Sequence, residues 1–205
     1  LFGSHARGEA REDSDIDLFV ITDEKINIKK EKFGIICVQE DKFENALKIA
    51  PILVYSMLNE ALPLINASLL WKLKQKYKPK LSDFGEFLDE NKLAIQVNED
   101  LLEKDRKKEY TANGASAYSL VLRLRAVFII HCLMHGKKYS YSLFKNWVED
   151  GLPKINFRAI YLVYSNLKMD KDMKVNIKTA DLEALLEFLK KEANKLKYGK
   201  KKKKA

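Results

Sequence analysis

The sequence predicts an α+β protein in which a small mixed-sheet domain, truncated at its N-terminus, is followed by an all-α helical bundle domain. Three observations support this prediction. Two short apolar, β-branched runs lie within the first 40 residues, helical periodicity dominates beyond residue 83, and a polar, Lys-rich stretch separates the two patterns. We therefore expect a first domain over 1–67, a connector over 68–82, a helical domain over 83–198 and a disordered basic tail over 199–205.

The composition is that of a chain able to fold. Of its 205 residues 46% are apolar, and 38 Lys plus Arg stand against 29 Asp plus Glu, a formal net charge of +9. These values exclude wholesale disorder. Residues 190–205 hold nine Lys and one Glu, so this segment accounts for +8 and the rest of the chain for +1. The Lys-rich tail could give non-specific affinity for RNA or simply keep the chain soluble, and both interpretations stay open.

Nothing in the sequence indicates export or a membrane span. The chain begins with Leu1-Phe2, which resembles the end of a strand whose start is missing, and shows no charged-then-apolar leader. Cys37 and Cys132 lack CxxC spacing, which argues against a disulfide framework or a thiolate zinc site and favours a reduced, cytoplasmic setting. The longest clean apolar run within 115–135 is only 126–130, whereas a spanning helix needs roughly 18 apolar residues, so we expect no membrane partner.

The elements of the first domain follow from short-range patterns. Residues 18–22 form an apolar, β-branched run closed by charged residues, as expected of a buried strand, and 33–39 has the same character. Residues 41–47 then look like the start of a helix, and 51–65 like a second helical or mixed segment interrupted by Pro63. The first 67 residues therefore mix strands with helices.

The second half shows helical spacing throughout. The last helix is the clearest, because leucines over 182–196 form one apolar stripe that Asp181 could cap at its N-terminus. The other expected helices cover 84–105, 115–135 after the Asn113-Gly114 break, 142–148 before Gly151 and Pro153, and 157–167.

The residues that carry chemistry lie at the start of the chain. Asp15 and Asp17 enter an apolar strand two positions apart, so their carboxylates point to the same face. Two adjacent carboxylates repel each other, and a divalent cation that prefers oxygen ligands, most naturally Mg²⁺, removes this cost. Gly3-Ser4 can form a tight turn whose amides and hydroxyl face a phosphate, and Arg7 adds a positive charge nearby.

These residues occur in an ordered pattern: Gly3-Ser4, Ala6-Arg7-Gly8, Ala10 and Ser14-Asp15-Ile16-Asp17-Leu18. The pattern resembles the signature of the DNA polymerase β-like nucleotidyltransferases, especially the minimal nucleotidyltransferase group, here with a C-terminal helical domain. The matching stretch covers about the first twenty residues, and the fold that it implies would extend to roughly residue 67.

The resemblance implies transfer of a nucleoside monophosphate from a nucleoside triphosphate to an acceptor hydroxyl on RNA, a protein or a small molecule. Gly3 and Ser4 would hold the triphosphate, with Arg7 near the phosphates, while Asp15 and Asp17 would bind a two-metal centre of Mg²⁺ or Mn²⁺. Family members commonly add a third carboxylate from a neighbouring strand.

The chain departs from the family at this third carboxylate. The strand over 33–39 contains no acid, and only Glu40 or Asp41 at its end could serve, although both are more simply the beginning of the next helix. Weak or lost catalysis therefore stays open. The alternative function is an antitoxin-like binding module that retains the fold and neutralises a partner without catalysis.

The helical half offers less specific candidates. His131 and His135 have a spacing that could hold zinc, but core or helix-end roles are expected, since no third ligand is apparent. Arg125 and His131 form an R-x5-H spacing similar to that of HEPN ribonuclease domains, although the residues between them are wholly apolar.

Other side chains of this half could reach a ligand or serve the fold. Arg123 and Arg125 could contact an acceptor, or pair with Glu99 or Asp100. The final candidates are aromatic residues near Lys137 and Lys138, which could stack on bases or form core: Tyr139, Tyr141, Phe144 and Trp147.

Overall fold

The structure is a computed structural model that describes residues 1–12, 14–107, 113–170 and 177–198. By its contacts the chain divides into two compact units. Unit 1 comprises Leu1–Phe84 together with Cys132–Tyr141, and unit 2 comprises Gly85–His131 with Ser142–Ala205. The expected tail over 199–205 lies outside the described residues. The architecture is α+β, with a small sheet in unit 1 and helices in unit 2, as the sequence predicts.

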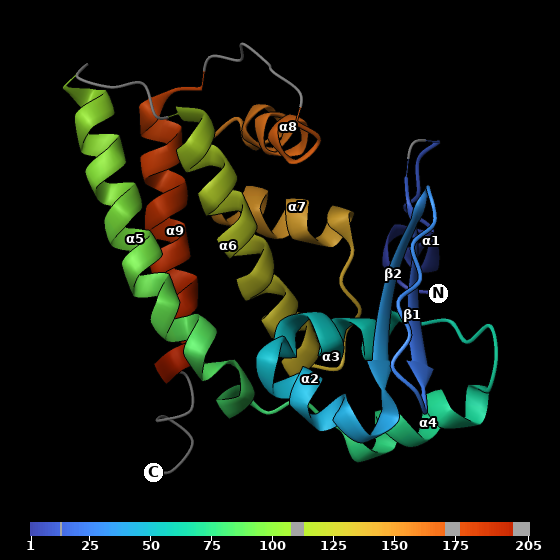
Figure 1. Cartoon of the computed structure of the whole chain (residues 1–205). Helices are drawn as coiled ribbons and strands as arrows, with labels where there is room; N and C mark the ends of the chain where they lie inside the picture. The colour runs from blue at the N-terminus through green and yellow to red at the C-terminus, as the bar shows by residue number, and fades with distance from the viewer. Residues whose placement is uncertain (13, 108–112, 171–176, 199–205) are drawn as a thin grey trace. The chain divides into compact units, whose positions relative to one another are not determined.

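The sheet of unit 1 has two parallel strands, β1 (Ile16–Thr22) and β2 (Phe33–Gln39), in a register that pairs Asp17 with Gly34 (Figure 1). The bounds of β2 are those predicted, and β1 begins two residues before the predicted strand. On the other edge of β1, Phe2 forms an antiparallel bridge in which its N–H donates to the carbonyl of Asp17 over 2.9 Å. Parallel and antiparallel pairing thus meet at Asp17, which makes the arrangement mixed.

Short helices surround this sheet. Their bounds are Gly3–Arg7 for α1, Phe43–Ile49 for α2, Pro51–Glu60 for α3 and Ala67–Lys76 for α4, with 3₁₀ turns at Glu40–Lys42 and Leu81–Phe84. Helix α4 runs through the stretch expected as a polar connector. Its N-terminus is capped by the Asn66 side chain, which accepts from the Leu69 N–H, and it buries Leu73.

The core of unit 1 is built around Phe43, which is 1% exposed. Its ring lies 6.1 Å from that of Phe19 on β1 and 5.1 Å from that of Tyr77 after α4. One side chain of α2 therefore joins the sheet to the end of α4. Burial of this kind contributes most of the stability of helices as short as these.

Unit 2 consists of helices in its described part: α5 (Gly85–Arg106), α6 (Asn113–Met134), α7 (Tyr141–Gly151), α8 (Phe157–Lys168) and α9 (Thr179–Tyr198) (Figure 1). Ion pairs join α5 to α9, with Lys190 Nζ 2.5 Å from Glu99 and Lys197 Nζ 2.5 Å from Asp89. Helix α9 begins two residues before Asp181, which therefore lies in its first turn; the prediction that Asp181 is the cap is wrong.

Helix α6 forms much of the core of unit 2, with Leu120, Leu124 and Ile130 fully buried. Its segment Gly114–Met134 is nevertheless long and apolar enough to cross a membrane, and about half of that apolar window is buried in the structure. The sequence argument from the short run over 126–130 missed this because it counted only uninterrupted apolar residues. Core helices share this composition, so the helix is weak evidence for a span.

Candidate functional site

The carboxylate of Asp17 occupies a slot between two glycines. A Cβ built on Gly3 would overlap Asp17 Oδ2, and a Cβ on Gly34 would lie 2.6 Å from Asp17 Oδ1. Gly3 has a φ of +72°, a left-handed conformation that favours glycine. The fold thus brings the predicted metal-binding residue Asp17 against the predicted phosphate turn at Gly3, fourteen positions earlier in the chain.

Asp15 lies one residue before β1 and is exposed, whereas Asp17 is half-buried. Alternation predicts that the two side chains share a face, but Asp15 precedes the strand, so their convergence stays a prediction. Two carboxylates supply oxygen ligands and negative charge, which is the chemistry that Mg²⁺ prefers, so this donor pair fits the predicted metal. Within the described parts of the chain, no group of three His, Cys, Asp or Glu side chains is placed to hold a metal ion.

The parallel register excludes the two acids that the sequence offered as a third ligand. Asp17 pairs with Gly34, while Thr22 pairs with Gln39 at the other end of the sheet. Gln39 is five residues beyond the level of Asp17, roughly 17 Å away at strand spacing, and Glu40 and the exposed Asp41 follow it. They form the 3₁₀ turn before α2, which confirms the structural interpretation.

The predicted phosphate turn is the one-turn helix α1, and its first amide already has a partner. The Gly3 N–H donates to Oε1 of Glu60, at the end of α3, over 2.9 Å. Ser4 is half-buried at the next position. After the turn, Gly8 adopts a φ of +70°, and the amides of Gly8 and Glu9 donate to the carbonyls of His5 and Ser4.

Arg7 lies within a network of charges. Its Nη1 donates to Glu60 Oε2 over 2.7 Å and its Nε to Glu9 Oε2 over 2.9 Å, while the guanidinium lies 5.3 Å from the centre of the Tyr139 ring. Burial disfavours the charge, but hydrogen bonds and Coulombic attraction from both carboxylates outweigh it and hold the pKa of Arg7 above its usual value. The Arg7 charge is thus balanced inside the protein, so its contacts favour positioning the turn over direct phosphate binding.

Glu60 and Glu9 are site residues that sequence reasoning missed. Glu60 is 5% exposed, and it is the charged residue at the end of the otherwise uncharged helix α3, which is the one signal that could have drawn attention to it. Glu9 uses its second oxygen, Oε1, to accept from the Tyr141 N–H over 2.6 Å. Gly3 is 57 positions from Glu60 and Tyr141 is 132 positions from Glu9 along the chain, and no local pattern predicts such contacts.

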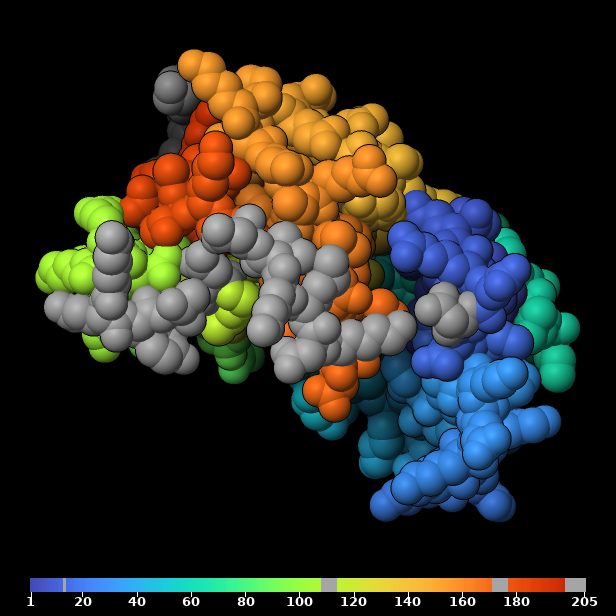
Figure 2. Space-filling model, turned by 90° about the horizontal axis from the view of Figure 1, so that it is seen from above, coloured from blue at the N-terminus to red at the C-terminus, as the bar shows by residue number. Residues whose placement is uncertain are grey.

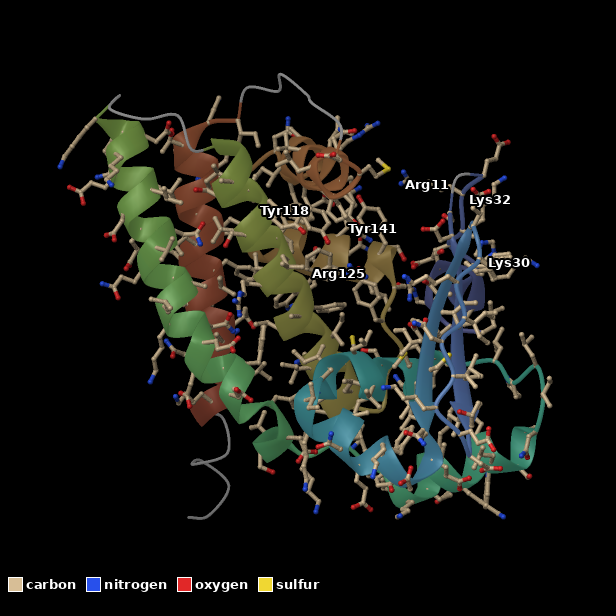
Figure 3. The ribbon with its side chains drawn as sticks, viewed as in Figure 1. Arg11, Lys30, Lys32, Tyr118, Arg125 and Tyr141 are labelled. Carbon is tan, nitrogen blue, oxygen red and sulfur yellow. The ribbon has the colours of Figure 1, made fainter. Side chains whose placement is uncertain are left out.

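Basic side chains lie at the end of the sheet where β1 begins. The Lys32 carbonyl accepts from the Ile16 N–H over 2.9 Å, and Lys32 and Lys30 belong to the turn before β2 (Figure 3). Arg11 lies in the turn before β1, where its N–H donates to the Ser14 hydroxyl. These side chains are exposed, and the N-terminal segment, blue in Figure 2, lies open on the face shown there. The exposed acids Glu12 and Glu31 are interspersed with them, so these turns carry charges of both signs.

The charged and histidine candidates of the second half of the chain have the following surroundings. Arg123 Nη1 lies 3.6 Å from Glu90. Arg123 therefore pairs with an acid of α5 as expected, but with Glu90 and not with Glu99 or Asp100. Arg125 Nη1 approaches the Tyr164 hydroxyl at 3.4 Å (Figure 3). His131 and His135 are exposed, which makes the core interpretation wrong, while His135 does lie at the end of α6.

The aromatic cluster is core at Phe144 and Tyr139, which are 0% and 7% exposed. Phe144 lies within 5.7 Å of the rings of Phe128 and Phe157, which belong to α6 and α8. A side chain closed in by neighbouring rings cannot stack on a base, so the core interpretation is confirmed for these two residues.

The fold and the site define a class of α+β proteins that set a glycine turn against a strand carboxylate, here Asp17, with a helical unit in the same chain. A family model described as a nucleotidyltransferase domain matches residues 1–111, more than half of the chain, and the protein belongs to that family. The match extends through α5. Neither the curated proteins nor the solved structures include a significant match. Family membership supports nucleotidyl transfer as the general activity.

Proposed function

We propose that the protein is a Mg²⁺-dependent nucleotidyltransferase that moves a nucleoside monophosphate from a nucleoside triphosphate to an acceptor hydroxyl. In this reaction the acceptor oxygen bonds to the α-phosphorus, the bond from that phosphorus to the β-bridging oxygen breaks, pyrophosphate leaves and the hydroxyl proton is released. The observation that carries the proposal is the contact of Asp17 with Gly3, which sets the metal-binding and phosphate-binding candidates side by side.

Each residue has a distinct role in this proposal. Asp15 and Asp17 hold the metal, and Gly3 and Ser4 hold the triphosphate, with Arg7 at the end of the same turn. The bound metal, when present, supplies positive charge that neutralises the triphosphate and the developing charge of transfer. Unit 2 would recognise the acceptor, which is RNA, a protein or a small hydroxylated molecule. The first experiment is designed to find which of these it is.

The experiment supplies each of the four α-labelled ribonucleoside triphosphates, Mg²⁺ and a cell extract to the purified chain. A labelled product identifies both the donor and the acceptor. Asp15→Asn and Asp17→Asn should abolish transfer and metal-dependent triphosphate binding while the fold is retained. Asp41→Asn is the matched control, because it makes the same change at the opposite end of the sheet. Wild-type transfer by both site variants would overturn the proposal.

A second candidate function is a non-catalytic binding module of the antitoxin-like kind. The observation in its favour is Gly34, which stands beside Asp17 where a neighbouring strand could have carried a third acid. This function predicts that the wild-type chain binds a nucleoside triphosphate with Mg²⁺ but yields no labelled product with any of the four donors. Transfer to any acceptor would exclude it.

A further inference from the structure

Among the buried side chains of the described residues, Glu60 carries a charge and the others are apolar or neutral polar. Taking a carboxylate out of water costs several kcal/mol unless its oxygens are well bonded. Glu60 meets this requirement by dividing its oxygens between two partners, the Gly3 amide and the Arg7 guanidinium. These partners are the first and the last residues of α1.

A helix of five residues has little stability of its own, because helix nucleation is costly. Helix α1 also has no side-chain cap at its N-terminus. Glu60 bonds to both ends of α1 and so fixes the turn that contains Ser4. The same turn brings Gly3 against the Asp17 carboxylate. The Arg7 end is held further by Glu9, which itself accepts from the Tyr141 N–H.

We infer that Glu60 is a positioning residue for nucleotide binding: its buried carboxylate holds the Gly3–Arg7 turn in the shape that receives the triphosphate. This inference rests on the proposed function, since it concerns the same site. The opposite role would be inhibition, because a carboxylate bonded to the Gly3 amide could compete with a phosphate for that donor. The bond to Arg7 favours positioning, since a competitor of the phosphate would have no need to hold the other end of the turn.

The test compares Glu60→Ala, Glu60→Gln and the control Asn59→Ala. Alanine removes both contacts, whereas glutamine can still accept one hydrogen bond but turns an NH₂ group toward the other donor. Asn59 precedes Glu60 on α3 and bonds to the carbonyl of Lys137 over 2.8 Å, so its variant removes a long-range contact without touching α1. The probe is the most tightly bound of ATP, GTP, CTP and UTP, titrated with Mg²⁺ in a calorimeter.

We expect Glu60→Ala to weaken triphosphate binding at least tenfold and Glu60→Gln by less, with KM raised more than kcat falls, because the turn binds the phosphates. In the ligand-free protein, amide exchange over residues 3–9 should become faster in Glu60→Ala and stay unchanged in Asn59→Ala. The exchange measurement needs no nucleotide, so it tests the hold on the turn even if the proposed transfer fails.

Four outcomes would overturn the inference, and the last of them would overturn the proposed function as well. Unchanged exchange over residues 3–9 in Glu60→Ala would show that the carboxylate does not hold the turn. If the wild type binds a nucleotide and Glu60→Ala binds it with the same affinity, the positioning role is excluded and the proposed function is not affected. Tighter binding by Glu60→Ala would mean that Glu60 competes with the phosphate. A wild type that binds none of the four nucleotides would overturn the proposed function together with the inference.

Discussion

Asp17 and Gly34 are partners across the parallel strands, and the Asp17 carboxylate fills the space that a side chain at residue 34 would need. The 2.6 Å between Oδ1 and a Cβ at Gly34 is shorter than real contacts of this kind. Gly3 closes the other side of the same carboxylate. The position of the predicted metal ligand thus depends on two residues that have no side chain.

Gly34→Ala tests this dependence. The new methyl group should turn the Asp17 carboxylate away from its slot, which should weaken Mg²⁺-dependent triphosphate binding about tenfold, roughly 1.4 kcal/mol, with little change in the melting temperature. Calorimetry measures the binding. Gly85→Ala is the control, because a Cβ at Gly85 meets nothing within 4 Å. Equal affinities for the two variants and the wild type would show that the carboxylate can move without loss.

Asn91→Leu should stabilise the protein. Asn91 is 1% exposed on α5, and neither atom of its amide has a hydrogen-bond partner among the residues described. Buried polar groups left unbonded cost about 1–3 kcal/mol, so a leucine of similar volume should raise the free energy of unfolding by about that amount in urea titrations.

Asn98→Leu is the matched comparison on the same helix. The Asn98 amide donates to the Ala94 carbonyl over 2.7 Å and to the Ser119 hydroxyl over 2.9 Å. Its replacement should therefore destabilise the protein by about 1 kcal/mol.

If Asn91→Leu lowers the free energy of unfolding instead of raising it, Asn91 holds an internal water.

Tyr55→Phe should change how stability depends on alkaline pH. Burial, followed by the hydrogen bond from its hydroxyl to Asp83 at 2.9 Å, raises the pKa of Tyr55 from 10.0 to about 12. The native state therefore keeps a proton that the unfolded chain releases, so the contribution of Tyr55 is complete below pH 10 and is lost as the pH rises toward 12. Up to roughly 2 kcal/mol is involved over that window.

The measurement is the free energy of unfolding of wild type and Tyr55→Phe at several pH values from neutral upward. We expect the wild type to be more stable at neutral pH by about 1 kcal/mol, the value of a typical hydrogen bond, and the advantage to shrink in alkali. A difference that does not vary with pH would contradict the raised pKa.

Deleting residues 199–205 should leave nucleotide binding unchanged and lower non-specific RNA affinity at low salt. The deleted segment carries five lysines, and each phosphate contact that it makes releases counterions and steepens the salt dependence. Binding to a labelled single-stranded RNA over a salt series measures both effects. RNA affinity that survives with its full salt sensitivity would instead direct attention to Lys137 and Lys138.

Local patterns predicted most of the elements and the family, but they missed α4, which runs through the expected connector. The strand over 33–39 was predicted at its observed bounds because an apolar, β-branched run closed by polar residues has few other solutions. Asp15 and Asp17 were placed on one face because alternation is a property of any strand. Gly3 and Ser4 were recognised from an ordered pattern over fewer than twenty residues, which also predicted the family that the comparison confirms.

Tertiary structure alone decided what surrounds these residues. The parallel register removed Glu40 and Asp41 from the site, because only pairing between strands determines which ends of them meet. The contacts of Glu60 with Gly3 and Arg7 join residues more than fifty positions apart, and no local periodicity encodes such a pairing. The sequence determined which groups could do chemistry; their partners and their distances arose when the chain folded back on itself.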